Sequence, residues 1–288
     1  MKVGRQLKSE EVLVKNFADK TVYITGGASG IGLEAGKRLA ALGAHIVVLD
    51  FNPTDIAQSA IEAARKSLAQ RVTRYRLDIA DRQEVLKTVA RAALEAGTPD
   101  LVINSAGIGV TGEFANMKFE DFDRVMQVNL YGSRHICEAV LPLMRARGRG
   151  KIVLIASMAA ITPVYGYTDY STSKFAVLGF GECLRYELKP LGIDVAVCCP
   201  GEVETPMVAT ERQIIHPATK AMKKSAGTIS VEQAVGELIS GLQREKAIIV
   251  LGGMSRVTFW LHRLLPPSVW NMVTDRIVTK ALKGMHQA

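Results

Sequence analysis

The chain has 288 residues, of which 48% are hydrophobic and 22% are charged, and it carries a formal net charge of +8. No segment reaches the ~18 uninterrupted apolar residues of a membrane-spanning helix, and the first residues lack the pattern of a signal peptide, so we expect a cytoplasmic protein. The four cysteines have no C-x-x-C spacing and the five histidines no ligand spacing, which argues against a metal site and favours reduced cysteines that serve in packing.

The first elements follow the order strand, glycine-rich turn, helix and strand. Residues 21–25 form an apolar, β-branched run, and residues 26–32 read Gly-Gly-Ala-Ser-Gly-Ile-Gly. A helical pattern at 33–42 and a second buried strand at 45–50 follow. Glycines let the backbone approach a pyrophosphate, and the start of the helix offers unpaired N–H groups. The pattern therefore predicts a dinucleotide site, with a flexible glycine loop as the alternative.

Strand-like and helical runs alternate along the remainder of the chain. Further strands are expected at 71–76, 100–104, 151–157, 193–199 and 247–250, and helices at 54–69, 81–96, 119–147, 169–191 and 231–243. Seven strands with intervening helices predict an α/β fold, a Rossmann-type doubly wound parallel sheet with helices on both faces. We expect one NAD-binding domain over 1–253 and an amphipathic helical extension over 254–288.

Ligands of such sheets bind beyond the carboxyl ends of the strands. Those ends carry Thr25, Asp50, Asn104, Ser157 and Pro200. The Asp50 carboxylate would accept hydrogen bonds from the adenosine ribose and repel a 2′-phosphate, by at most about 4 kcal/mol for unit charges ~4 Å apart at an effective dielectric constant of ~20. NAD is therefore favoured over NADP as the cofactor, although Asp50 could also be a solvated loop acid.

Tyr170 and Lys174 lie four residues apart in a helical pattern and so share one face. A free tyrosine has a pKa near ~10, and a neighbouring cation would lower that pKa toward neutrality. Tyr165 and Tyr167 lack such a partner, because Asp169 and Ser171 stand four residues after them. The pair predicts a proton-transfer site, although the same spacing also arises by chance on surface helices.

With these motifs in order, the chain resembles the short-chain dehydrogenase/reductase family from about residue 19 to residue 250. Residues 25–32 are similar to its T-G-x-x-x-G-x-G motif, and Asn-Ser-Ala-Gly at 104–107 is similar to its N-N-A-G, with Ser105 as a departure. The resemblance implies a catalytic tetrad of Asn129, Ser157, Tyr170 and Lys174. It implies cofactor contacts from Tyr170, Lys174 and a further set: Gly26, Ser29, Gly30, Ile31, Gly32, Asp50, Asp78, Ile79, Asn104, Ala106, Gly107, Pro200, Gly201, Val203 and Thr205.

The resemblance also implies a reaction, hydride transfer between a nicotinamide and a carbon that bears oxygen. Tyr170 would exchange a proton with the substrate oxygen, and Ser157 would orient that oxygen. Lys174 would lower the pKa of Tyr170 and bind the nicotinamide ribose. Asn129 would hold a water that links Lys174 to solvent.

The substrate is less clearly indicated. The resemblance implies that residues 206–230 form a substrate loop, and their apolar residues together with Lys220, Lys223 and Lys224 predict an apolar lid with a basic edge. Residues 170–177, 187–195 and 204–206 look most like the 3-ketodihydrosphingosine reductase branch of the family, which favours a hydrophobic alcohol or ketone. That branch generally uses NADPH and carries a membrane-anchoring end, and both properties depart from this chain. A 3-oxoacyl thioester or steroid-type reductase is an alternative, and a non-catalytic NAD-sensing module is an alternative of another class.

The segment after residue 253 has apolar residues at helical spacing, interrupted by Pro266 and Pro267. Residues 255–288 hold five Lys or Arg and one Asp, a net charge of +4. We expect the segment to cover the substrate pocket or a subunit interface of a homodimer or homotetramer. The alternative is peripheral contact of residues 255–288 with an anionic membrane. Nucleic acid is not expected as a partner, because aromatic and basic residues are not interleaved.

Overall fold

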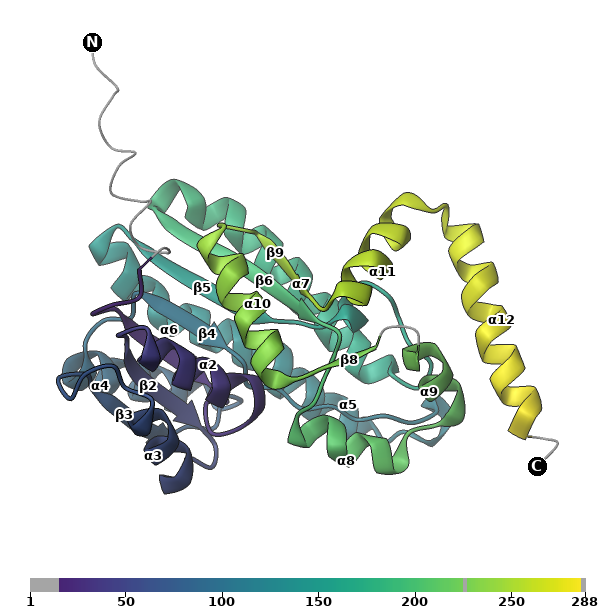
Figure 1. Ribbon diagram of the computed structural model, residues 1–288, viewed down its shortest axis with the longest axis horizontal. Coiled ribbons are helices and arrows are strands. Elements are labelled where there is room, and N and C mark those ends of the chain that lie inside the picture. Colours follow the sequence, from purple (N-terminus) through teal and green to yellow (C-terminus); the bar gives the residue numbers. More distant parts are fainter. Residues whose placement is uncertain (1–15, 225–226, 286–288) are drawn as a thin grey trace, which may run out of the picture.

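The computed structural model describes residues 16–224 and 227–285, and a sheet of seven parallel strands lies at its centre (Figure 1). The strands are ordered β3-β2-β1-β4-β5-β6-β9. Their bounds are β1 (Thr21–Thr25), β2 (His45–Asp50), β3 (Val72–Arg76), β4 (Leu101–Asn104), β5 (Gly150–Ile155), β6 (Ile193–Pro200) and β9 (Ile248–Leu251). Successive strands are added toward one edge of the sheet from β1 to β3 and toward the other edge from β4 onward. This topological switch point between β1 and β4 opens a crevice at their carboxyl ends.

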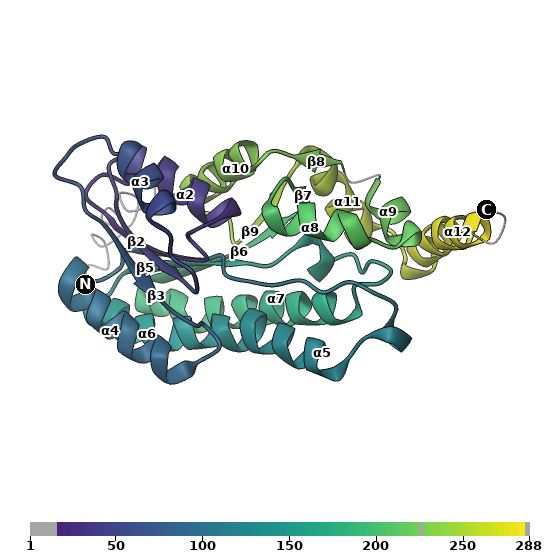
Figure 2. The same ribbon diagram turned by 90° about the horizontal axis from the view of Figure 1, so that it is seen from below.

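Helices cover both faces of the sheet, as predicted (Figure 2). One face carries α4 (Arg82–Ala96), α5 (Phe119–Met126), α6 (Gly132–Arg147) and α7 (Thr168–Leu188). The other face carries α2 (Gly30–Ala41), α3 (Asp55–Ala63) and α10 (Val231–Gln243). The predicted doubly wound α/β fold is therefore confirmed.

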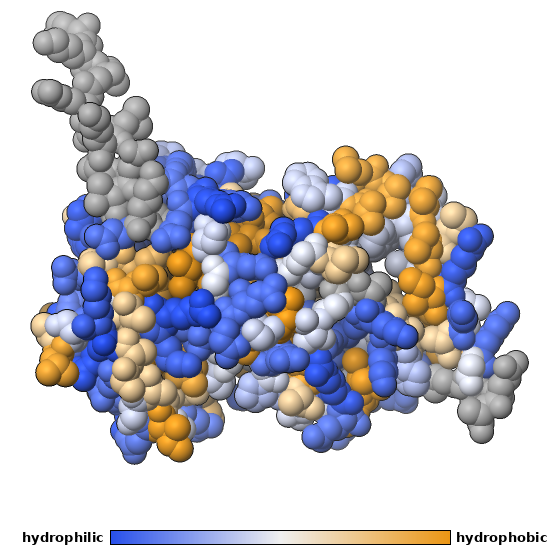
Figure 3. Space-filling model, viewed as in Figure 1, coloured by the Kyte–Doolittle hydropathy of each residue, from blue (hydrophilic) through white to orange (hydrophobic). Residues whose placement is uncertain are grey.

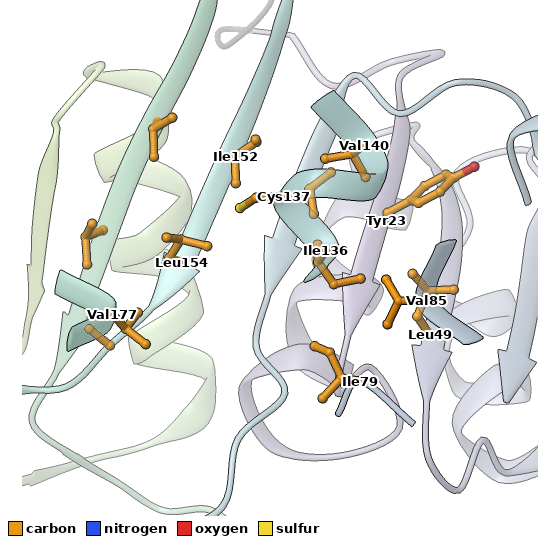
Figure 4. Close-up of a cluster of buried hydrophobic side chains, with 14 of the residues drawn as sticks. Tyr23, Leu49, Ile79, Val85, Ile136, Cys137, Val140, Ile152, Leu154 and Val177 are labelled. Atoms are coloured by element: carbon orange, nitrogen blue, oxygen red, sulfur yellow. The ribbon is translucent and has the colours of Figure 1, made fainter. Parts of the chain in front are cut away.

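Each face of the sheet has its own hydrophobic core, because alternate strand residues point to opposite sides. On the face shown in Figure 4, Ile136 and Val140 of α6 pack toward Tyr23 and Ile152 of the strands. Burial raises the pKa of the Cys137 thiol in this core to about 12, so the thiol stays protonated and serves in packing. All four cysteines are free, and Cys183 differs from the prediction because it is exposed.

One predicted helix is interrupted, and another ends early. The helix expected at 119–147 contains a five-residue π-helical stretch, Gln127–Tyr131, between α5 and α6. The helix expected at 54–69 ends at Ala63, because Gln70 folds the following loop back. The Gln70 side-chain amide donates to the carbonyls of Ala40 and Ala44, at 2.7 and 2.8 Å.

The predicted substrate loop is mostly helical and contains α8 (Pro206–Ile214) and α9 (Pro217–Lys224). We call residues 206–224 the lid. Thr205 caps α8 by accepting a hydrogen bond from the Val208 N–H, and Pro206 occupies the first turn, where its missing N–H costs nothing. A two-stranded parallel sheet of β7 (Glu202–Val203) and β8 (Thr228–Ile229) flanks the lid.

The C-terminal segment forms an arch of α11 (Gly253–Leu264) and α12 (Pro267–Met285), with the predicted break at Pro266 (Figure 1). Phe259 of α11 is buried in the core of the molecule, and α12 packs against α9 of the lid. Figure 3 shows hydrophobic residues gathered along both helices of the arch. Within the described ranges, no helix has the length and hydrophobicity required to cross a membrane.

Candidate active site

Two adjoining cavities open beyond the carboxyl ends of the strands. The first, of about 360 Å³, reaches from the glycine turn to Lys174, and the second, of about 830 Å³, lies between the first cavity, the lid and the arch. Ser157 and Tyr170 line both cavities. A group held in either cavity could therefore meet these two hydroxyls.

The glycine turn brings backbone segments closer together than side chains would allow. Gly26 has a φ of +63°, and a Cβ there would lie 2.9 Å from the Cα of Ala106. A Cβ on Gly32 would lie 2.2 Å from the carbonyl oxygen of Gly26. Ser29 precedes α2 in an extended conformation, and its hydroxyl makes no capping bond to the helix. The turn thus leaves helix N–H groups and one hydroxyl for an anionic ligand, as a pyrophosphate requires.

Asp50 ends β2 at the edge of the first cavity. Its two carboxylate oxygens accept hydrogen bonds from the N–H groups of Ala28 at 3.0 Å and Asn52 at 2.9 Å. Each oxygen retains a lone pair for a ribose hydroxyl. Arg76, which pairs in register with Asp50, was not predicted near this site; its guanidinium lies over the Phe51 ring at 5.0 Å from the centroid.

A chain of hydrogen bonds beneath the cavity connects β1, β4 and α6. The Thr25 hydroxyl donates to Asn104 Oδ1 at 2.7 Å and accepts from the Ala106 N–H at 3.1 Å. The Asn104 amide donates to the Ser133 hydroxyl at 2.8 Å. Neither Asn104 nor Gly32, both predicted to contact the cofactor, lines the cavity. Asn104 supports the cavity wall from behind through these bonds.

Asn129 lies within the π-helical stretch and is almost fully buried. Its side chain exchanges two hydrogen bonds of 2.9 Å with the backbone of Ile108, and it donates to Ser173 of α7 at 2.9 Å. Both amide protons are thus used within the protein. Asn129 thus connects the loop after β4 to α7, while its role in holding a water stays a prediction.

Tyr170 and Lys174 share one face of α7, and the Lys174 ammonium lies 5.7 Å from the centre of the Tyr170 ring. The ammonium donates to the Ile155 carbonyl at 2.9 Å. Burial raises the pKa of Tyr170 to about 12, against the lowering effect of Ser157, and burial lowers the pKa of Lys174 to about 8. The expected depression of the Tyr170 pKa by Lys174 is therefore wrong, because burial of the phenol is the largest influence on its pKa and raises it.

Most of the residues predicted to bind the cofactor line the first cavity: Gly26, Ser29, Gly30, Ile31, Asp50, Asp78, Ile79, Ala106, Gly107, Tyr170, Lys174, Pro200, Gly201, Val203 and Thr205. Residues without a predicted role also line it: Leu77, Ile108, Arg124 and Val128. Arg124 stands on α5, and no spacing in the sequence indicates that this helix reaches the cavity. Gly201 packs directly beneath Ser255 of the arch, because a Cβ on Gly201 would lie 2.2 Å from the Ser255 hydroxyl.

The second cavity is largely apolar, and the arch supplies part of its wall. The apolar residues of the arch that line it are Met254, Val257, Leu261, Trp270, Val273 and Ile277. These residues therefore cover the second cavity, while the identity of this cavity as the substrate pocket stays a prediction. Trp260 and Leu264 differ, because 57% and 75% of their surfaces are exposed.

Comparison of the sequence with known proteins identifies the family of this chain. A family model for short chain dehydrogenase matches residues 20–215. The protein named "Probable oxidoreductase EphD" of Mycobacterium tuberculosis is 34% identical over 279 residues, which are 91% of this chain and 46% of that protein. 3-Ketodihydrosphingosine reductase of Bos taurus is 31% identical over 221 residues, covering 76% of this chain and 67% of that enzyme.

Solved structures agree with the sequence match. Levodione reductase superposes with a TM-score of 0.74 and 26% identity, over 84% of this chain and 99% of that one. NAD⁺-bound xylitol dehydrogenase superposes with a TM-score of 0.75 and 25% identity, over 83% of this chain and 100% of that one. The chain belongs to the short-chain dehydrogenase family of NAD(P)-dependent oxidoreductases. The chain spans about half of the length of EphD, because the match covers 46% of that protein.

Proposed function

We propose that the protein interconverts a secondary alcohol and a ketone on a hydrophobic, lipid-like molecule, with NAD as its cofactor. The observation that carries the proposal is the largely apolar cavity of about 830 Å³ that meets the cofactor cavity at Ser157 and Tyr170. Cavities of this size bury most of a drug-sized ligand, and a few polar groups orient it. Here the orienting groups would be the hydroxyls of Ser157 and Tyr170, at the end of the cavity that meets the first cavity.

Each residue of the tetrad then has a role that its surroundings support. Ser157 would hydrogen-bond the substrate oxygen, and Tyr170 would give or take the proton at that oxygen. Lys174 would donate to the cofactor ribose from its buried position, while Asn129 would hold the loop and helix in place. The bound nicotinamide would supply or accept the hydride.

NAD is the proposed cofactor because the Asp50 carboxylate stands where the adenosine ribose would lie. We expect NADH to bind at least tenfold more tightly than NADPH, since a negative carboxylate repels a 2′-phosphate. Asp50→Ala should narrow that gap, chiefly by improving NADPH binding. Fluorescence titration with both cofactors measures the difference, and Asp55→Ala, at an exposed position outside the cavity, serves as the control. Equal or tighter NADPH binding by the wild type would reject the assignment and favour the sphingoid-type reductase reading.

The substrate proposal is tested with ketones of increasing chain length, followed through NADH absorbance. Each buried methylene contributes about 0.8 kcal/mol, so kcat/KM should rise roughly fourfold per methylene until the cavity is filled. Trp270→Ala removes part of the cavity wall and should flatten this dependence. A preference for short, polar ketones would contradict the proposal.

Trp260→Ala is the matched control, because Trp260 is exposed and does not line the cavity.

The same variant tests the peripheral membrane contact that we propose for residues 255–288. The exposed Trp260 and Leu264 support that contact, together with the net positive charge of the segment. Cosedimentation with phosphatidylglycerol vesicles that weakens in Trp260→Ala would favour it, whereas no binding would leave the arch as a cavity wall only.

Two other assignments are less well supported. A 3-oxoacyl thioester or steroid-type substrate would use the same tetrad, and the chain-length series with cyclic ketones included separates these from straight chains. An NAD-sensing module would not require a tetrad or an apolar second cavity. We also propose a homodimer or homotetramer, which the family resemblance implies.

A further inference from the structure

The wall of the second cavity carries one buried cluster of charged residues. Of the described residues that line this cavity, only Glu202, Glu211 and Lys223 are charged. Their side chains are 12%, 15% and 15% exposed, so the cluster is held largely away from water. Buried charges are costly unless they are paired and hydrogen-bonded, which makes each partner important.

Lys223 of α9 is the centre of the cluster. Its ammonium contacts Glu202, Glu211 and the Tyr167 hydroxyl, each at 2.8 Å. The Tyr167 hydroxyl also donates to Glu211. Burial and Glu211 raise the pKa of Tyr167, so this hydroxyl remains protonated and can donate. Burial would raise the pKa of Glu202, but bonds from Lys223 and Arg212 lower it, and Glu202 stays charged.

These contacts tie the lid to the segment that starts the catalytic helix. Glu211 belongs to α8, Lys223 to α9, and Tyr167 directly precedes α7. A second tie lies nearby, where the Thr219 hydroxyl donates to the Tyr165 carbonyl at 2.8 Å. The Tyr167 ring meets the Tyr170 ring edge-on, with 5.5 Å between centroids. Any movement of the lid would therefore reach Tyr170 through Tyr167.

We propose that Tyr167, Glu211 and Lys223 form a latch that holds the lid closed over the substrate cavity and positions Tyr170. Within it, Glu211 and Lys223 are positioning residues, which act on Tyr170 through Tyr167 and through their charges. The kinetic test rests on the proposed function, but a test of lid opening does not.

The charges of Glu211 and Lys223 should affect the pH dependence of the reaction, which a merely structural role would leave unchanged. Tyr170 is faced by Ser157, Lys174, Tyr167 and Glu211, and of these Glu211 raises its pKa. Alcohol oxidation needs the deprotonated tyrosine, so its rate should rise with pH through the pKa of Tyr170. Glu211→Gln should move this rise to lower pH. Lys223→Met should move it to higher pH, because Glu211 then loses its counterion.

The experiment compares three variants and one control. The pH dependence of kcat/KM for a long-chain secondary alcohol is measured for the wild type, Glu211→Gln and Lys223→Met. Hydrogen exchange is measured over residues 165–174 and 206–224 for these proteins and for Tyr167→Phe. Lys220→Met is the control, because Lys220 is an exposed lysine on the same helix and lies outside the cavity wall.

We expect opposite pH shifts in Glu211→Gln and Lys223→Met, and faster exchange in both segments for Tyr167→Phe and Lys223→Met, with Lys220→Met like the wild type. Shifts of the same sign, or exchange unchanged from the control, would overturn the proposal. If the alcohol is not oxidised at all, the proposed function fails while the exchange data still decide on the latch. If Lys223→Met does not fold, Tyr167→Phe carries the test, since it removes a single hydroxyl.

Discussion

Tyr170→Phe should lower kcat for ketone reduction by about 10²–10⁴-fold, which is the usual contribution of general acid–base catalysis. The substitution removes the group that exchanges a proton with the substrate oxygen but keeps the ring that packs against Tyr167. NADH affinity should fall far less than kcat, because only the Tyr170 hydroxyl is lost from the cofactor cavity while the glycine turn and Asp50 are untouched. Steady-state kinetics and a separate NADH titration measure the two effects.

Tyr186→Phe provides the matched control, because Tyr186 stands on the same helix and is 69% exposed. It should retain full activity. Ketone reduction at the wild-type rate by Tyr170→Phe, with NADH bound, would show that the tetrad is not the catalytic machinery. The NAD-sensing alternative would then become the better description.

Gly32→Ala should weaken NADH binding by about 100-fold. A Cβ on Gly32 would lie 2.2 Å from the Gly26 carbonyl oxygen, which is backbone and cannot rotate away. Overpacking of this kind costs roughly 1–3 kcal/mol, and a loss near the upper end corresponds to about two orders of magnitude in Kd. The strain falls on the turn that approaches the pyrophosphate, so calorimetric titration of NADH is the direct measurement.

Gly179→Ala is the corresponding control, because a Cβ at this position of α7 meets no atom within 4 Å. Alanine should stabilise the helix there by roughly 0.5–1 kcal/mol, since glycine is the poorer helix former. Wild-type NADH affinity in Gly32→Ala would mean that the turn relaxes without cost and that its close packing does not shape the cofactor site.

The fold could be predicted from the sequence because its signals are local. Buried strands such as 45–50 read as continuous apolar runs, and residues 26–32 show a glycine pattern with a direct physical reason. The placement of Tyr170 and Lys174 on one helix face could be predicted for the same reason, since they lie one helical turn apart. Asn129 and Ser157 were expected only from the family resemblance. Helix ends were less predictable where long-range bonds decide them, as with Gln70 and the end of α3.

The latch could not be predicted, because its members stand on separate elements and meet only in the folded chain. Lys223 looks like the basic edge of a surface lid in the sequence, yet its side chain is 15% exposed and paired with two carboxylates. The pKa of Tyr170 failed as a prediction for a related reason. Helical spacing reveals the neighbouring cation but not the burial that surrounds both groups.

The contact of Ser255 with Gly201 connects two parts of the molecule that are distant from each other in the sequence. Ser255 is 2% exposed and lies in the first turn of the arch, whereas Gly201 lines both cavities. Any residue other than glycine at position 201 would push its side chain against the start of the arch, because a Cβ there would lie 2.2 Å from the Ser255 hydroxyl. A substitution at this one position would therefore disturb the walls of both cavities together.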